Sequence, residues 1–226
     1  MQGNNCGHDP DKPRWFEPPK QHTRPKIISK AIAEIRRYYR APVATIPSLN
    51  LANGSERQQR SERREACLAV LSCLLHYLDL VSLRVGIPQN DTSFQGISMP
   101  FIAEKSGLSL RRAERAAADL VRAGLITVHP LCQKLTDTAY KGYAAIRTIS
   151  AKLFALLGMS ARLRHERERA TARQRKRNRK HEQKQAAKIS LVADMIANQA
   201  NIFDPTESAA MSAIRKLKSI LSDSDP

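Results

Sequence analysis

Two amphipathic segments separated by one glycine constrain the fold of this chain more than any other feature. Residues 98–106 and 110–123 both have helical hydrophobic spacing, and Gly107 supplies the turn between them. Ser109 is placed to cap the second helix, and Gly124 is placed to end it. The sequence therefore predicts two helices that meet at a tight turn.

A hairpin is predicted directly after this helix pair. Residues 125–128 form a short β-branched strand, residues 129–143 a loop, and residues 144–149 a second strand. Two helices, a turn and a two-stranded hairpin together predict a winged helix-turn-helix. We expect a mainly α fold with this core, a small β-hairpin wing and helical extensions at both ends.

The second helix of the pair has one apolar and one charged face. The predicted buried stripe consists of Leu110, Ala113, Ala117, Leu120 and Val121. The predicted opposite face consists of Arg111, Arg112, Arg115, Asp119 and Arg122. Such a helix fits the major groove, where arginine can bind guanine in bidentate fashion. We interpret Arg111, Arg115 and Arg122 as base or phosphate contacts, Arg112 as a phosphate contact, and the amides behind Ser109 as a phosphate site. A solvated basic helix in a bundle is the alternative.

The rest of the chain divides around this core. Residues 86–96 are rich in turn-forming residues and are predicted to be a loop, and 151–157 a short helix. The predicted segments are a disordered or draped Pro-rich arm (1–25), a helix and linker (26–55), the winged-helix domain (56–158) with a first helix starting near Ser61, a long basic helix (159–203) and a C-terminal amphipathic helix (204–226).

Positive charge indicates the partner. The chain of 226 residues has 38 Lys and Arg against 21 Asp and Glu, a formal net charge of +17, which favours polyanions and nucleic acid above all. Residues 161–188 carry twelve of the basic residues and three Glu. Five of them are predicted phosphate contacts: Arg173, Arg175, Lys176, Arg177 and Arg179. A solvated helix with i,i+4 pairs is the alternative. In the wing, Lys134, Lys141 and Arg147 are candidates for DNA contact, and ordinary surface charge explains them equally well.

Several function classes are disfavoured. No apolar run is long enough to span a bilayer, the N-terminus lacks signal-peptide features, and no C-x-x-C spacing occurs, so we expect a cytoplasmic protein in which Cys67 and Cys73 pack in the core. The sequence has no P-loop, Gly-x-Ser-x-Gly or His-Glu-x-x-His motif. Tyr38 and Tyr39 suggest a nicking tyrosine, but no His-x-His accompanies them, and Tyr39 falls on an apolar helix stripe. We expect a binding protein without enzymatic activity, cofactor or metal.

Four blocks carry a resemblance to a known family. They are HYLDLVSLRVGI, ISMPFIAEKSGLS, RRAERAAADLVRAGLITV and FALLGMS, the last followed by an Arg-rich helix. In this order, over roughly residues 10–180, the chain resembles the RepA plasmid replication initiators of the F II incompatibility group. The loop at 131–143 shares little with that family beyond length, and the tail after Lys180 is shorter and less basic.

The resemblance implies a function in plasmid replication and copy control. It implies sequence-specific binding to double-stranded DNA at the plasmid origin, help in opening the duplex, and recruitment of host replication proteins such as the initiator and the helicase. The DNA-reading segment would be residues 109–122. A transcriptional repressor built on the same winged helix is the first alternative, and a rolling-circle nicking enzyme is the second. A homodimer stays open.

Overall fold

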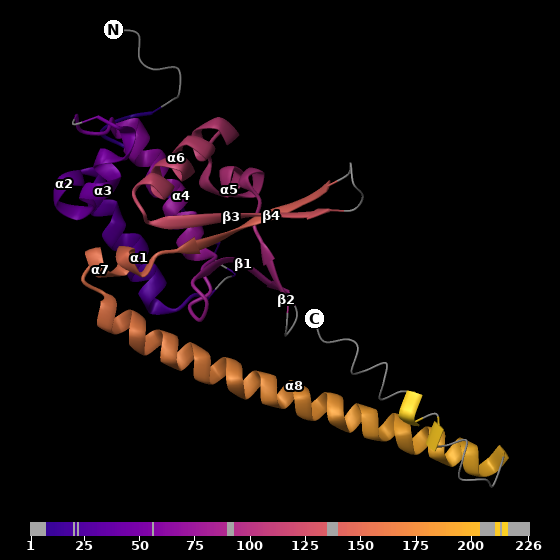
Figure 1. Cartoon of the computed structure of the whole chain (residues 1–226). Coiled ribbons are helices and arrows are strands. Elements are labelled where there is room, and N and C mark those ends of the chain that lie inside the picture. The colour runs from indigo at the N-terminus through magenta and orange to yellow at the C-terminus, as the bar shows by residue number, and fades with distance from the viewer. Residues whose placement is uncertain are drawn as a thin grey trace. The chain divides into compact units, whose positions relative to one another are not determined.

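The computed structural model describes residues 8–19, 21, 23–55, 57–89, 93–134, 140–203, 211–212 and 214–216. By compactness the chain forms two units, one up to Ala172 and the other from Arg173 onward. The expectation of a mainly helical protein with a small sheet is confirmed (Figure 1). The described helices are α1 (Lys26–Ile35), η1 (Arg36–Tyr39), α2 (Pro42–Thr45), α3 (Pro47–Asn50), η2 (Leu51–Asn53), α4 (Ser61–His76), α5 (Met99–Ser106), α6 (Leu110–Arg122), α7 (Ala151–Leu156) and α8 (Ser160–Phe203).

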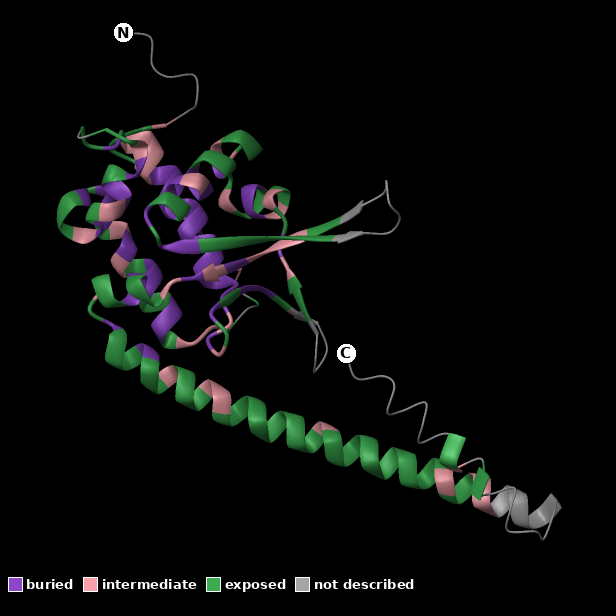
Figure 2. Cartoon of the chain, in the orientation of Figure 1, coloured by how far each residue is buried: buried purple, intermediate pink, exposed green. Residues whose placement is uncertain are grey.

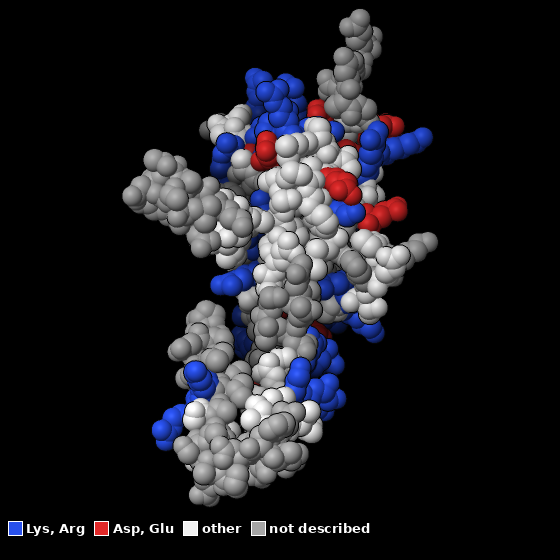
Figure 3. Space-filling view, turned by 90° about the vertical axis from the view of Figure 1, so that its right-hand side faces the viewer, with Lys and Arg blue, Asp and Glu red and all other residues white. Residues whose placement is uncertain are grey.

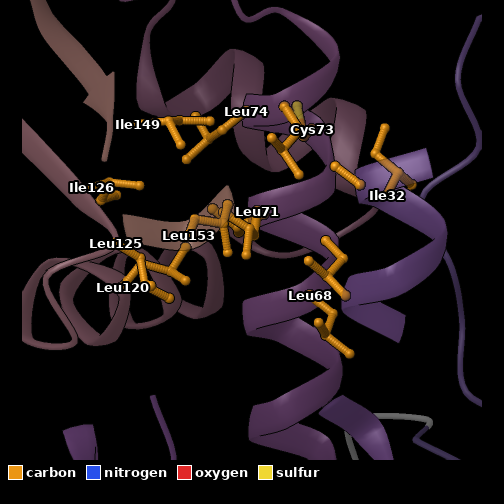
Figure 4. Packing of buried hydrophobic residues seen from close by; sticks show 14 of the residues in the cluster. Ile32, Leu68, Leu71, Cys73, Leu74, Leu120, Leu125, Ile126, Ile149 and Leu153 are labelled. Carbon is orange, nitrogen blue, oxygen red and sulfur yellow. The ribbon is translucent and has the colours of Figure 1, made fainter. Parts of the chain in front are cut away.

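Helix α4 is the centre of the first unit. Its residues from Glu65 to His76 are all buried, so it has no solvent-facing side over three turns (Figure 2). Leu68, Leu71 and Leu74 project from it into the core, where side chains from α1, α6, α7 and the sheet meet them (Figure 4). A helix that is apolar on every side is stable only when other elements surround it, which explains why this one is wrapped.

The predicted helix pair is confirmed in its bounds. Helix α5 is capped by the Ser98 hydroxyl, which accepts a hydrogen bond from the Phe101 amide at 3.4 Å. Gly107 follows it with a φ of +65°, a conformation that glycine adopts without a Cβ penalty. Helix α6 then starts at Leu110, and Gly124, with a φ of +68°, follows its last turn.

The sheet is larger than the sequence suggested. Its strands are β1 (Arg84–Gln89), β2 (Ser93–Gly96), β3 (Ile126–Lys134) and β4 (Tyr140–Ile149), in the antiparallel order β2-β1-β4-β3. The prediction of a loop over 86–96 is wrong, because β1 and β2 pair there. Gly86 is required at this point, since a Cβ would lie within 3 Å of the Gln95 carbonyl oxygen and of the Phe94 ring.

The hairpin after α6 is longer than predicted. The expected loop at 129–143 is wrong over most of its length, because β3 continues to Lys134 and β4 begins at Tyr140. The register shifts between His129 and Leu131. Pro130 lies at the shift and has no N–H for the ladder, so a bulge lets the strand continue past a residue that usually stops one. His129 is therefore an exposed strand residue and not a turn residue.

The segment predicted as a linker is packed. Helix α1 ends at Ile35, and Pro42 and Pro47 each open a new short helix at its first position. Ile46 and Leu49 from this segment are fully buried in the main core. The linker prediction is therefore wrong for residues 41–53, where alternating Pro and apolar residues build compact turns.

The N-terminal arm was predicted to be either disordered or draped over the protein. Residues 8–19 are irregular in conformation but lie against the helices, with Phe16 only 4% exposed and Trp15 half-buried. The Tyr39 hydroxyl donates to the Pro10 carbonyl at 2.9 Å, and the Arg14 amide donates to Glu65 at 2.9 Å. Of the two predicted states for this arm, the structure has the draped one over these residues.

The boundary after the first unit lies inside α8. Met159 and Leu163 are buried in the core, and the Arg167 guanidinium donates to the carbonyls of Leu80 and Val81 at 3.2 and 2.9 Å. The start of α8 thus belongs to the first unit, beyond the predicted end at 158. The predicted helix over 204–226 lies mostly outside the described residues. No described helix combines the length and hydropathy needed to cross a membrane.

Candidate nucleic-acid interface

Helix α6 presents arginines to solvent on one side. Arg111 and Arg115 are exposed, and the Arg115 Nε donates to the Arg111 carbonyl one turn earlier at 3.4 Å. Figure 3, which looks at the side toward which the two hairpins point, shows several groups of Lys and Arg over the upper part of the molecule, with Asp and Glu among them. Two of the predicted DNA-reading arginines are therefore free to meet a partner.

A buried carboxylate, one turn after Arg115, anchors α6 to α4. Asp119, predicted on the exposed face, is fully buried, and this prediction is wrong. Its two oxygens accept a bidentate pair of hydrogen bonds from Arg63 on α4, at 2.5 and 2.6 Å. Arg122 donates to the same carboxylate at 3.1 Å. A buried charge needs such partners, and a helical wheel cannot show that they come from another helix.

Gln59 extends this anchor to the N-terminal helices. Its side-chain amide donates to Asp119 at 3.2 Å, and its side-chain oxygen accepts from the buried Tyr38 hydroxyl at 2.9 Å. Its backbone amide donates to Asn50 at 3.0 Å. Burial raises the pKa of Tyr38 and of the neighbouring Cys67, so both stay protonated at neutral pH. We call Gln59, Arg63, Asp119 and Arg122 the Asp119 cluster; it fixes α6 against α4 and η1.

The four predicted arginines of α6 thus have different environments. Arg112 is half-buried and lies 3.6 Å from Glu62 of α4, so its assignment to the exposed face is wrong. Arg122 is 60% exposed but donates to Asp119 and, at 3.3 Å, to the Ala52 carbonyl. Arg111 and Arg115 have no carboxylate partner within 4 Å among the described residues.

The start of α6 has the features of an anion site. Ser109 is exposed, and its hydroxyl makes no capping hydrogen bond, contrary to the prediction. The first amides of a helix lack intrahelical partners, and the helix dipole adds partial positive charge there.

Two apolar residues of α6 and two arginines before α4 are exposed, which the sequence reasoning missed. Leu110 and Val121, predicted in the buried stripe, are 44% and 42% exposed. Arg57 and Arg60 are exposed in the segment that leads into α4, and they flank Gln59 of the Asp119 cluster in the sequence. The sequence signal for these arginines was their repetition between residues 57 and 64. Only the packing of α4 against α6 shows that this segment lies next to α6.

The β3–β4 hairpin, predicted as the wing, offers fewer described basic side chains than expected. Arg147 is buried, and its Nη1 donates to the carbonyls of Ile97, at 2.5 Å, and Ala145, at 3.3 Å, so its prediction as a DNA contact is wrong. Lys134 and Lys141 lie in β3 and β4, but their side chains are outside the described part. The exposed wing residues that are described include Val128, Leu131 and Tyr143.

The basic segment of α8 is solvated. Arg173, Arg175, Lys176, Arg177 and Arg179 are all exposed. The predicted i,i+4 pairs do not form; in the described part of this helix, the Glu166 carboxylate instead meets Arg169 at 3.3 Å. None of the five basic side chains lies within 4 Å of a described carboxylate. They belong to the second unit, separate from α6.

The residues considered for other chemistry are buried. Tyr38 and Tyr39 are 0% and 3% exposed, and Cys67 and Cys73 are buried free thiols. Burial raises the pKa of Cys73 to about 12. Over the described stretches of the chain, no cluster of three or more His, Cys, Asp or Glu could hold a metal ion.

A comparison with protein families supports the resemblance that the sequence motifs indicated. The IncFII RepA protein family matches residues 9–206, which is most of the chain. Comparison with curated proteins and with solved structures gives no match. With its two-helix element, hairpin and basic helix inside the matched range, this chain belongs to the IncFII RepA family and is a RepA-like plasmid replication protein.

Proposed function

We propose that this protein initiates plasmid replication by binding the origin sequence-specifically through a winged helix. The observation that carries the proposal is α6, where Arg111 and Arg115 are exposed while Asp119, one turn after Arg115, is buried and bonded to Arg63 of α4. A rigidly held helix can enter the major groove in one orientation, which reading bases requires. The family supports a role in replication initiation.

The elements around α6 support the winged-helix assignment. Helices α5 and α6 meet at Gly107, and the β3–β4 hairpin follows α6 directly. In such a domain the second helix reads bases and the hairpin reaches the neighbouring backbone. Arg111 and Arg115 are the proposed base contacts. Arg122 and Arg112 have a positioning role in this proposal, because both have carboxylate partners.

Phosphate contacts supply the remaining affinity. The free amides at Ser109 are suited to one phosphate. The basic segment of α8, Arg173 to Arg179, is suited to several, because exposed arginines neutralise phosphates without reading sequence. Lys134 stays a candidate in the wing.

Initiation also requires partners. We propose that the bound protein recruits the host initiator and helicase and acts without catalysis of its own, in the cytoplasm. The nicking alternative has no support from Tyr38 and Tyr39, because neither ring can reach a scissile phosphate from the core.

Footprinting tests the proposal. The purified protein is bound to the DNA that flanks its own gene, with random duplex as competitor, and the same samples are probed for unpaired bases. We expect a protected tract of several helical turns with strand opening nearby. A single short protected palindrome over the promoter, without opening, would make the protein a repressor and overturn the proposal.

A further inference from the structure

A second basic surface lies at the amino-terminal end of α4. It consists of Trp15, Arg36, Tyr39, Arg40 and Arg64, and we call it the arginine–aromatic surface. It combines residues of the N-terminal arm, η1 and α4. No contact of the α6 interface uses these residues.

Aromatic rings hold the arginines of this surface in place. The Arg36 guanidinium lies 5.3 Å from the centre of the Trp15 ring, and those of Arg40 and Arg64 lie 5.9 and 5.4 Å from the centre of Tyr39. The two rings pack edge to face at 5.7 Å. A guanidinium stacked on a ring can still present N–H groups to an anion such as phosphate. Arg40 is exposed, Arg36 also donates from its Nη2 to the Phe16 carbonyl at 3.4 Å, and the Arg64 Nε is buried without a partner among the described residues.

The N-terminal arm pairs with Glu65, an acidic residue that would otherwise neutralise part of this surface. Glu65 follows Arg64 on α4, but it is only 3% exposed. Its Oε2 lies 3.0 Å from His8 Nδ1 and accepts from the Arg14 amide at 2.9 Å. Draping the arm over α4 therefore satisfies this carboxylate internally.

The local charge balance remains positive. Among the described residues, no carboxylate lies within 4 Å of Arg36, Arg40 or Arg64. The acids on the arm and on α1 are Asp9, Asp11, Glu17 and Glu34, the last of which pairs with Arg37 at 3.3 Å. The exposed basic residues nearby include Lys12 and Arg60.

We propose that the arginine–aromatic surface binds the phosphate backbone of duplex DNA, independently of sequence, beside the segment read by α6. This proposal rests on the proposed function. Consecutive residues of α4 link the two surfaces, because Arg63 bonds Asp119 of α6 while Arg64 lies over Tyr39. A protein partner is a poorer fit, since Trp15 is half-buried and Tyr39 buried, leaving little of their apolar area exposed.

The test compares two charge-matched double variants of the full chain. Arg36→Gln with Arg40→Gln removes two charges from this surface. Arg84→Gln with Lys152→Gln removes two exposed charges elsewhere in the same unit. Affinity is measured for the footprinted duplex and for a random duplex between roughly 50 and 200 mM salt, where each phosphate that is no longer neutralised lowers the slope of log K against log salt by about 0.9.

We expect the first variant to lose the same factor of affinity on both duplexes, with a slope reduced by up to roughly 1.8. The Arg84, Lys152 variant should keep the wild-type slope. Arg36→Lys with Arg40→Lys, which keeps the charge, should restore most of the slope and guards against a folding defect. Equal slopes in the first variant and the control would overturn this proposal while leaving α6 readout intact. Absence of duplex binding by the wild type would overturn both.

Discussion

Helix α6 and the basic segment of α8 are both rich in arginine, yet they differ in what lies behind the charge. In α6 the side away from Arg111 and Arg115 is buried in the core through Ala113, Ala116 and Leu120, and Asp119, one turn after Arg115, is bonded to Arg63 of α4. In α8 the residues from Arg173 to Arg179 are exposed. Two helices with similar charge are therefore suited to different tasks: the anchored one to reading bases, and the solvated one to neutralising phosphates.

The largest expected effect comes from breaking the anchor of α6. Asp119→Asn should lower the free energy of unfolding by about 3 kcal/mol, because it removes the charge that Arg63 and Arg122 share. The low end of the usual range applies, since both arginines are partly exposed and can turn to water. Denaturant unfolding measures the change.

Glu62→Gln is the matched control for this variant. Glu62 pairs with Arg112 at 3.6 Å near the surface, and such a pair contributes about 1 kcal/mol or less. If the two variants lose similar stability, Asp119 is not the anchor of α6.

A smaller effect on stability is expected at alkaline pH, and it should be confined to the first unit. Burial raises the pKa of Cys67 and Cys73 in the folded state, that of Cys73 to about 12. The unfolded thiols ionise first, so stability is unchanged below about pH 9 and should fall above it by about 1.4 kcal/mol per pH unit for each thiol. Circular dichroism of denaturant titrations at several alkaline pH values measures this.

Cys67→Ala with Cys73→Ala should flatten that decline. The second unit contains no cysteine, so its helix should not follow the alkaline transition of the first. A decline that is equally steep in the double variant would exclude the thiols as its cause.

The smallest effect on stability is expected in α8. Replacing Arg173, Arg175, Arg177 and Arg179 by Gln should leave unfolding of the first unit within about 0.5 kcal/mol, because none is buried. The salt slope of DNA binding should fall by roughly 0.9 for each phosphate that these arginines no longer neutralise, on specific and random duplexes alike. An unchanged slope would mean that these arginines contact solvent and not DNA phosphates.

Periodicity and breaker residues predicted much of the fold. Helices α1, α5, α6 and α7 begin where the sequence indicated, because Pro25, Ser98, Ser109 and Ser150 precede regular apolar spacing. The β1–β2 hairpin was missed because Gly86 and Pro88 are typical of loops. The Gln95 carbonyl oxygen and the Phe94 ring, which lie against Gly86, explain a glycine within that strand.

The site was predicted less completely than the fold. Arg111 and Arg115 are exposed as the helical wheel suggested, but Arg112, Asp119 and Arg147 are not. A wheel shows which residues share a face and does not show which faces meet another element. Asp119 is buried because Arg63, from a helix more than fifty residues earlier, supplies the opposite charge.

The central claim is that α6 reads sequence while α8 does not, and paired variants test it most directly. Arg115→Ala and Arg175→Ala are each measured on the footprinted duplex and on a random duplex at one salt concentration. We expect Arg115→Ala to cost about 1–3 kcal/mol on the specific duplex and less on random DNA, and Arg175→Ala to weaken both equally. An equal loss on both duplexes for Arg115→Ala would contradict base reading by α6.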